Sequence, residues 1–328
     1  MKDRILEELR GAYPDFVSGP QLAQSLNISR VAVWKHIEAL KQAGYDIVAV
    51  KGKGYRLHNA EQVIIPSLLE KQLDKSRWGS PLYFAAQTES TNLWARQLLD
   101  LEPLIPEGAL VLAATQTGGR GRRGRKWSSP QGGLYFSIIL RPTLDLQRAS
   151  LLSLVLAVAC ARSLQKFINY PCGIKWPNDV MINGLKTGGI LLEASGEMDS
   201  LAYVVAGVGI NVNLTPPDLP VEVRSLATSL TAVTGQNYDI NLLAAHLLND
   251  LQQDYDFFLQ EGFPPFLEAY KQHCIHLRQP ISVNTGKGQI KGINKDIDGN
   301  GNLLIEVDGK LLPISTGDVQ LVDFQGEQ

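Results

Sequence analysis

The stretch QTGGRGRRGRKW, Gln116–Trp127, places four arginines and one lysine among four glycines, directly after an apolar segment. Its Gly119-x-Gly121-x-x-Gly124 spacing formally matches the dinucleotide-binding turn of a parallel Rossmann sheet, in which the glycines must open a helix. Here the chain continues instead through SSPQGG into Leu134–Leu140, whose aromatic and aliphatic residues are typical of a strand. A Rossmann turn also has small residues where this loop has arginines. The context therefore argues against a Rossmann sheet and favours an α+β fold.

Strands and helices are expected on both sides of this loop, because apolar segments bounded by turn residues alternate with segments of helical periodicity. The expected strands are Leu82–Ala86, Ala109–Thr115, Ile174–Trp176, Val180–Ile182, Gly189–Glu193 and Tyr203–Val212, and the expected helices are Thr88–Leu99, Arg148–Asn169 and Tyr238–Gln260. Asn183-Gly184 is typical of a two-residue hairpin turn. We predict a mixed, mostly antiparallel sheet with helices packed on one side.

The first sixty residues predict a winged helix-turn-helix. Three short helices are expected, one over residues 4–10, one that begins at Ser18-Gly19-Pro20, and one that Ser29 caps and Gly44 ends. Their predicted inward side chains are Ile5, Leu6, Leu9, Leu22, Ala23, Leu26, Val33, Trp34, Ile37 and Leu40. Two strands, Tyr45–Val50 and Tyr55–Leu57, would follow around a basic hairpin tip. Helix-turn-helix plus hairpin is the pattern of a winged helix.

Basic side chains gather on the third helix and on the hairpin tip, where a winged helix meets phosphates and base edges. Residues 1–60 carry nine Lys/Arg and six Asp/Glu, a balance of +3, whereas the remainder has a balance of −5. The predicted DNA-binding residues are Ser29, Arg30, Lys35, His36, Lys51 and Lys53, with Arg56 beside them. A small helical module that never binds DNA is the alternative.

Length and changes in composition predict several domains. We expect the winged helix at 1–60, a linker at 61–80 with a short helix at 66–73, a central domain at 81–272 and a C-terminal domain at 273–328. From about Leu277 the chain is rich in Gly, Asn and Asp and has short apolar runs, which favours a small β-barrel.

Composition and cysteine placement exclude several classes of protein. The chain is 44% hydrophobic and 20% charged, as is ordinary for a globular protein. Cys160, Cys172 and Cys274 lack metal-ligand spacing, so we expect three buried thiols in a reducing compartment. The N-terminus is charged where a signal peptide is apolar, and Leu151–Ala161 is shorter than the ~20 residues of a membrane helix. We expect a soluble, cytoplasmic protein with no membrane partner.

Three further motifs follow the arginine loop, each beside a predicted strand. They are KWPND at Lys175–Asp179, GLKTGGILLE at Gly184–Glu193 and GVGINVN at Gly207–Asn213. Together they place a lysine, amides and a carboxylate among glycines at the ends of adjacent strands. Glycines let a backbone approach a ligand, and arginines bind phosphate or carboxylate oxygens in pairs. The pattern indicates a site for a nucleotide, a divalent metal and a small acid, although a basic loop can also be a second nucleic-acid patch.

In this order, Ser90-Thr91-Asn92, the arginine loop, KWPND, Lys186 with Gly188-Gly189-Ile190, and Gly207–Asn211 resemble the motifs of biotin–protein ligases. The first sixty residues resemble the winged helix of the bifunctional, biotin operon repressor subset. The resemblance covers essentially the whole chain. It implies a central domain like that of class II aminoacyl-tRNA synthetases and an SH3-like C-terminal β-barrel.

The resemblance also implies a two-step reaction that uses ATP and Mg²⁺. Biotin would react with ATP to give biotinyl-5′-AMP, and a lysine on the biotin carboxyl carrier protein of acetyl-CoA carboxylase would then take the biotin. With biotinyl-5′-AMP bound, the chain would dimerise on operator DNA and repress biotin biosynthesis genes.

The residue roles come from the same resemblance. The implied catalytic residues are Lys186, Arg120, Arg122 and Asp179, with Asp179 also at the metal and no general base assigned. The implied biotin-binding residues are Ser90, Thr91, Asn92, Gln116, Gly119, Arg120, Gly121, Arg122, Lys186, Gly189 and Gly207. The implied ATP- and adenylate-binding residues are Arg122, Trp127, Asn178, Asp179, Lys186 and Asn211.

Two other functions stay open from the sequence alone. A lipoate or octanoate ligase-transferase resembles this fold but would not be expected to need the arginine loop or a winged helix. A transcription factor whose body only senses a small ligand would have no use for Lys186, Asp179 and an arginine loop around one pocket. Exchange of pyrophosphate into ATP that depends on biotin or on lipoate separates the enzymes.

Overall fold

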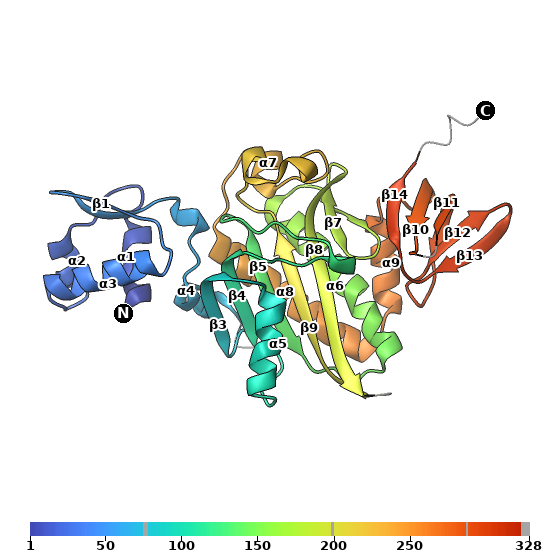
Figure 1. Ribbon diagram of the computed structural model, residues 1–328, viewed down its shortest axis with the longest axis horizontal. Helices are drawn as coiled ribbons and strands as arrows, with labels where there is room; N and C mark the ends of the chain where they lie inside the picture. The colour runs from blue at the N-terminus through green and yellow to red at the C-terminus, as the bar shows by residue number, and fades with distance from the viewer. Residues whose placement is uncertain (75–77, 198–199, 287, 323–328) are drawn as a thin grey trace.

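Three parts follow one another along the long axis of the molecule (Figure 1). The computed structural model describes residues 1–74, 78–197, 200–286 and 288–322. The N-terminal helices and hairpin lie at one end, a large sheet with long helices lies in the middle, and a smaller sheet lies at the other end. The large sheet therefore separates the two smaller parts.

The N-terminal part is a three-helix unit with a two-stranded wing. Its elements are α1 (Lys2–Gly11), α2 (Gly19–Ser25), α3 (Arg30–Gln42), β1 (Ile47–Val50) and β2 (Gly54–Leu57). Ser18 and Ser29 begin α2 and α3 by accepting hydrogen bonds from the backbone N–H groups of Gln21 and Ala32. One apolar core joins the helices to the wing. The predicted winged helix-turn-helix is therefore confirmed.

One predicted inward residue of α3 is wrong. Val33, Ile37 and Leu40 are buried, whereas Trp34 is 55% exposed. The three buried residues share one helix face, and Trp34 lies about 100° around the helix from Val33. Trp34 therefore lies on the solvent side of α3, together with exposed Val31.

The segment between the wing and the large sheet is packed against the central part. It contains a 3-10 helix at Ala60–Gln62 and α4 at Pro66–Gln72, close to the short helix expected at 66–73. The Asn241 side chain accepts a hydrogen bond from the N–H of Ile65 and donates one to the carbonyl of Val63, both at 2.8 Å. This buried amide satisfies two backbone groups that would otherwise lack partners.

The winged helix is also fastened to the start of α8 (Ile240–Glu261). Asp239 begins this helix by accepting hydrogen bonds from the N–H groups of Asn241 and Leu242. The same carboxylate forms an ion pair with Arg10 of α1. One side chain therefore both caps a core helix and holds the N-terminal part.

The central sheet has seven described strands in the order β3-β4-β5-β9-β8-β7-β6. They are β3 (Leu82–Thr88), β4 (Leu110–Gln116), β5 (Leu134–Leu140), β6 (Gly173–Lys175), β7 (Asp179–Ile182), β8 (Leu185–Glu197) and β9 (Ser200–Ile210). Only β3 and β4 pair in parallel; the other neighbours are antiparallel. The predicted mixed, mostly antiparallel sheet is confirmed.

Helices cover both faces of this sheet, so the prediction of helices on one side is wrong. Alternate residues of a strand point to opposite faces. On β5, Ile138 belongs to the core with α6 (Leu146–Ile168) and α8, whereas Ile139 belongs to a separate cluster with α5 (Thr91–Leu101). The connection from β3 to β4 thus carries α5 across the face opposite α6.

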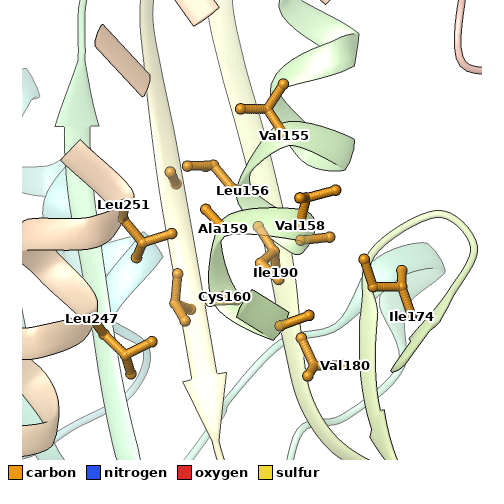
Figure 2. Close-up of a cluster of buried hydrophobic side chains, with 14 of the residues drawn as sticks. Val155, Leu156, Val158, Ala159, Cys160, Ile174, Val180, Ile190, Leu247 and Leu251 are labelled. Atoms are coloured by element: carbon orange, nitrogen blue, oxygen red, sulfur yellow. The ribbon is translucent and has the colours of Figure 1, made fainter. Parts of the chain in front are cut away.

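Helix α6 is the centre of the larger core. Figure 2 shows its Val155, Leu156 and Val158 among side chains of the sheet and of α8. The helix is long and apolar enough to cross a membrane by composition, but two thirds of its apolar window is buried inside the protein. Cys160 lies in this core, and Cys172 and Cys274 are also buried and unpaired, as predicted.

Two further helices complete the central part, α7 (Leu230–Thr234) and α9 (Pro264–His273). The C-terminal part is an antiparallel sheet in the order β13-β12-β11-β10-β14. Its strands are β10 (Pro280–Asn284), β11 (Gln289–Ile297), β12 (Leu303–Val307), β13 (Lys310–Ile314) and β14 (Asp318–Leu321). Its apolar residues join the core around α6. The SH3-like barrel and the class II synthetase-like architecture stay predictions.

Candidate active site and DNA-binding surface

A row of glycines lies on the α5 face of the sheet, where β8 and β9 pair. We call Gly189, Gly207 and Gly209 the glycine shelf; Gly189 pairs with Gly209. A Cβ at Gly209 would lie 2.7 Å from Nε1 of Trp127, and one at Gly207 would overlap Oδ1 of Asn92. The missing side chains therefore let Trp127 and Asn92 lie directly against the strand backbone.

Beside the shelf, uncharged polar groups bond to one another; we call this group the neutral end. The backbone N–H of Thr91 donates to Oε1 of Gln116 at 2.8 Å, and Nε2 of Gln116 donates to Oγ of Ser129 at 2.8 Å. The hydroxyl of Ser137 donates to Oδ1 of Asn92 at 2.7 Å. The start of α5 and the end of β4 thus bring together residues that lie 25 positions apart.

Ser90, Thr91 and Asn92 reach this end because they form the first turn of α5, which Ser90 caps. The sequence interpretation missed Ser129, Ser137 and Glu193, whose Oε2 accepts a 2.9 Å hydrogen bond from the Asn92 amide. An isolated serine in a loop or strand carries no sequence signal for such a role, and the GLKTGGILLE motif, which Glu193 ends, does not indicate one for the glutamate.

At the other side of the shelf lies a charged end, which we define as Lys175, Asp179, Lys186 and Arg122. Nζ of Lys186 lies 2.6 Å from Oδ1 of Asp179, and Nζ of Lys175 lies 3.6 Å from Oδ2. The Lys186 ammonium also lies 5.1 Å from the centre of the Trp127 ring, within cation–π range. Burial lowers the pKa of Lys186, and the attraction of Asp179 opposes this shift.

Asn178 ties the charged end to β8. Its backbone carbonyl accepts a hydrogen bond from the N–H of Ile190 at 3.1 Å, and its side-chain amide donates to the Ile190 carbonyl. Its Oδ1 accepts a hydrogen bond from Arg122 at 3.4 Å. Burial lowers the pKa of the Arg122 guanidinium. The KWPND motif is therefore held beside the strand that carries Lys186.

The arginine loop is closed by its own backbone. The N–H of Trp127 donates to the carbonyl of Gly119 at 2.9 Å, and the N–H of Gly121 donates to the carbonyl of Arg125 at 2.7 Å. Arg122 is the arginine of this loop that bonds to the KWPND motif. Arg120, implied as catalytic, lies 3.4 Å from Glu89 and is largely exposed.

The other two arginines of the loop contact the C-terminal sheet. Arg123 lies 3.3 Å from Asp318 and donates a 2.9 Å hydrogen bond to the carbonyl of Asn284. Arg125 also pairs with Asp318. The loop therefore divides its cations between the neighbourhood of Asn178 and the rim that borders the C-terminal part.

Asn211 is almost fully buried beside the charged end. Its side-chain amide donates to the carbonyl of Thr228 at 2.9 Å, and the N–H of Thr228 donates to the carbonyl of Lys186 at 2.9 Å. Asn211 thus holds the segment 226–228, which runs beside Lys186 and which the sequence interpretation missed. Within the described residues, no cluster of three or more His, Cys, Asp or Glu side chains could hold a metal.

The N-terminal part presents a separate basic surface. Arg30 and Lys35 are exposed on α3, on the same solvent side as Val31 and Trp34, and Lys51 and Lys53 are exposed at the tip of the wing. His36 is half-buried, and Ser29 caps the helix. Arg56 is half-buried and instead packs over the ring of Phe16 at 4.8 Å, and its guanidinium donates to the carbonyl of Pro14.

Models of known families match three parts of the chain. The biotin/lipoate A/B protein ligase family matches residues 84–211, an HTH domain matches residues 2–56, and a biotin protein ligase C-terminal domain matches residues 276–322. These matches fall on the central part, the winged helix and the smaller sheet.

Curated relatives match over nearly the whole length. The bifunctional ligase/repressor BirA of Bacillus subtilis (strain 168) is 35% identical over 322 residues, which cover 98% of each chain. The protein of the same name from Escherichia coli (strain K12) is 36% identical and covers 94% of this chain and 93% of its own. Among solved structures, the biotin protein ligase of Aquifex aeolicus in complex with biotin and ATP is similar at 30% identity and a TM-score of 0.64. It covers 74% of this chain and 98% of its own.

Proposed function

The chain belongs to the family of bifunctional biotin ligase/repressors, and from this premise we propose the chemistry of its two activities. It is an ATP-dependent biotin–protein ligase that also represses transcription through its winged helix. The observation that carries the ligase assignment is the pairing of Lys186 and Asp179 at 2.6 Å, next to Trp127 and the glycine shelf. This arrangement offers a half-buried cation, a carboxylate and an aromatic ring to a small acid and a nucleotide.

In the first step, a carboxylate oxygen of biotin attacks the α-phosphorus of ATP. The bond from that phosphorus to the pyrophosphate breaks, and biotinyl-5′-AMP forms. Negative charge gathers on the phosphoryl oxygens in the transition state, where a fixed cation stabilises it. We assign this role to Lys186, because its ammonium is half-buried and held by Asp179 rather than free in solvent.

The neutral end suits the other part of biotin. The ureido ring is uncharged and both donates and accepts hydrogen bonds, as do Thr91, Gln116 and Ser90. Trp127 lies against Gly209 and Lys186, so we assign it to the boundary between biotin and the adenine nucleotide. Arg122 would contact the phosphates from its position beside Asn178.

Mg²⁺ fits this site as a partner of ATP. It is commonly bound by one or two carboxylates together with substrate phosphates, and Asp179 supplies one carboxylate next to the proposed phosphate position. When bound, the ion would neutralise phosphate charge. Lys186 and Lys175 share the same carboxylate, so ATP and water would supply most of the metal's ligands.

In the second step, the ε-amine of a lysine on the carrier protein attacks the carbonyl carbon of biotinyl-5′-AMP. An amide forms, AMP leaves, and the amine loses a proton. We propose the biotin carboxyl carrier protein of acetyl-CoA carboxylase as the acceptor, which places the reaction in the cytoplasm.

The repressor activity would use the exposed face of α3 and the tip of the wing. Arg30, Lys35, Lys51 and Lys53 can neutralise phosphates, and Trp34 adds an apolar surface next to them. One winged helix offers few phosphate contacts, so we propose that two copies bind one operator when biotinyl-5′-AMP is bound. Linkage then requires operator DNA to tighten adenylate binding by the same factor.

The ligase is tested with purified protein, Mg-ATP, labelled pyrophosphate and either biotin or lipoate. We expect exchange of label into ATP only with biotin, and mass spectrometry should find one biotin on a carrier-domain lysine. Exchange that depends on lipoate would identify a lipoate ligase instead, and no exchange with either acid would leave a ligand-sensing transcription factor.

The repressor is tested by titrating an inverted-repeat operator while following mass by ultracentrifugation. We expect two chains per operator with biotin and ATP together, and much weaker binding with biotin alone. Equal DNA affinity in both conditions would contradict the corepressor role.

A further inference from the structure

The KWPND motif is held in place by residues that come from beyond the central sheet. The backbone N–H of Trp176 donates to Nε2 of His276 at 2.9 Å. The carbonyl of Pro177 accepts a 3.0 Å hydrogen bond from the hydroxyl of Tyr270, and the indole N–H of Trp176 donates to the carbonyl of Gly301 at 2.9 Å. These partners lie at the end of α9, just after it, and in the turn between β11 and β12.

His276 and Tyr270 are fully buried, and Trp176 is 2% exposed. A backbone N–H in such a place cannot exchange its partner for bulk water, so losing the acceptor leaves it unsatisfied. His276 thus bonds to the N–H of Trp176, and Tyr270 bonds to the carbonyl of the next residue in the same turn. The turn is followed immediately by Asn178 and Asp179.

We propose that His276, together with Tyr270, positions the KWPND motif for the nucleotide step of the reaction. The two residues need not touch the substrate. They fix the backbone of Trp176 and Pro177, and that backbone fixes where Asp179 meets Lys186 and where Asn178 meets Arg122. The inference rests on the proposed ligase function and adds two positioning residues to it.

His276 can accept this hydrogen bond because its ring is uncharged. Burial lowers the pKa of His276 to about 4, so Nε2 keeps its lone pair at neutral pH. The charged group acting on it is Lys175, which lowers the pKa further. With Nε2 as the acceptor, the ring proton lies on Nδ1, 3.6 Å from Sγ of Cys274, so the sulfur can accept this proton on the other side of the ring.

We call the bonds of His276 and Tyr270 to Trp176 and Pro177 the clamp; the neutral end does not depend on it. Its hydrogen bonds join α5, β4, β5 and the loop that carries Ser129, whereas the clamp joins the turn between β6 and β7 to the C-terminal part. Loss of the clamp should therefore weaken the nucleotide step and spare biotin binding. A residue that only stabilises the fold would affect both ligands alike.

The test compares His276→Phe, which keeps a buried ring without an acceptor, with His276→Gln, whose Oε1 can reach the position of Nε2. Each full-length variant is measured for the KM of ATP in biotin-dependent pyrophosphate exchange, for the Kd of biotin by calorimetry, and for its Tm. We expect His276→Phe to raise the KM of ATP about tenfold, with a biotin Kd within about twofold of the parent. We expect His276→Gln to restore most of the loss.

Tyr270→Phe removes only the hydroxyl and carries the test if His276→Phe does not fold; we expect a smaller rise in the KM of ATP. His246→Gln, a half-buried histidine of α8 beside Asp250, is the matched control and should leave both constants unchanged. Equal losses of ATP and biotin affinity, an unchanged KM of ATP in the Phe variants, or no rescue by glutamine would overturn the proposal. An inactive parent protein would instead contradict the ligase assignment itself.

Discussion

At the neutral end of the site, Thr91, Gln116 and Ser137 are joined by short hydrogen bonds between uncharged groups, whereas at the charged end Lys186 and Lys175 share the carboxylate of Asp179. The first arrangement is shape-specific, because hydrogen bonds between neutral groups depend on the distance and angle between donor and acceptor. The second concentrates two ammonium groups, which can pair with a phosphate in place of the carboxylate. The difference indicates that recognition of the acid and stabilisation of the reacting phosphate are built as separate modules on one shelf.

The most severe test of this separation is Lys186→Met. Removal of one charge-stabilising contact typically costs about 2.7–4 kcal/mol in the transition state, so adenylation should fall about 100- to 1000-fold. The Tm should stay close to that of the parent, and the biotin Kd should rise far less than adenylation falls. Pyrophosphate exchange measures adenylation, and calorimetry measures the biotin Kd. Lys166→Met, at an exposed lysine of α6, is the control. Near-normal exchange in Lys186→Met would remove the lysine from the mechanism.

Gly207→Ala tests whether the shelf belongs to the neutral end. The added Cβ overlaps Oδ1 of Asn92, so Asn92 or β9 must move. We expect a loss of about 1–3 kcal/mol in the free energy of unfolding, measured with urea, and weaker biotin binding. Gly299→Ala, where a Cβ meets nothing within 4 Å, is the control. Unchanged stability and biotin affinity would show that the close approach at Gly207 has no consequence.

Gln116→Ala is the mirror of the His276 experiment at the opposite end. It removes the acceptor of the Thr91 N–H and the donor to Ser129. We expect the biotin Kd to rise about tenfold, while the KM of ATP at saturating biotin changes less than about twofold. The exposed Gln253 of α8 offers a control in Gln253→Ala. A variant in which both constants rise together would mean that the two ends act as one unit.

Arg123→Gln should have the smallest effect, even though Arg123 lies next to Arg122 in the sequence. Its ion pair with Asp318 is partly exposed, and such pairs contribute about 0–1 kcal/mol. We expect less than about a threefold change in the KM of ATP, compared with a larger rise in Arg122→Gln. If Arg123→Gln were the more damaging variant, the charged end would extend to the C-terminal sheet.

The winged helix and the strands beside the glycine-rich motifs could be predicted from the sequence, because helix caps and turns depend on neighbouring residues. Ser18, Ser29 and Asn183-Gly184 all lie where their turn chemistry predicts. The placement of α5 on the opposite face could not be predicted, since its apolar periodicity is the same for either face. Trp34 was misplaced for a similar reason, because a large apolar residue next to Val33 predicts burial whatever its task.

The site was harder to predict because it depends on distant partners. Four arginines of one loop look equivalent in sequence, and their division follows from Asp318, which lies 195 residues beyond Arg123. His276 belongs to no motif, and its contact with Trp176 spans 100 residues. The role of Asn211 beside the nucleotide stays a prediction, and its hydrogen bond to Thr228 involves a residue with no sequence signal of its own.

The carboxylate of Asp239 has a consequence for the spacing of the two half-sites that a dimer would bind. This carboxylate caps α8 and also pairs with Arg10, so the position of the winged helix is set by a helix of the central core as well as by the connecting segment. In a dimer of two such chains, the two α3 helices would lie at a fixed distance and angle from each other. Moving the half-sites apart by a single base pair rotates one of them by about 35° around the duplex. The DNA must then twist so that both half-sites face the two α3 helices. The number of base pairs between the half-sites should therefore be as restricted as the bases themselves.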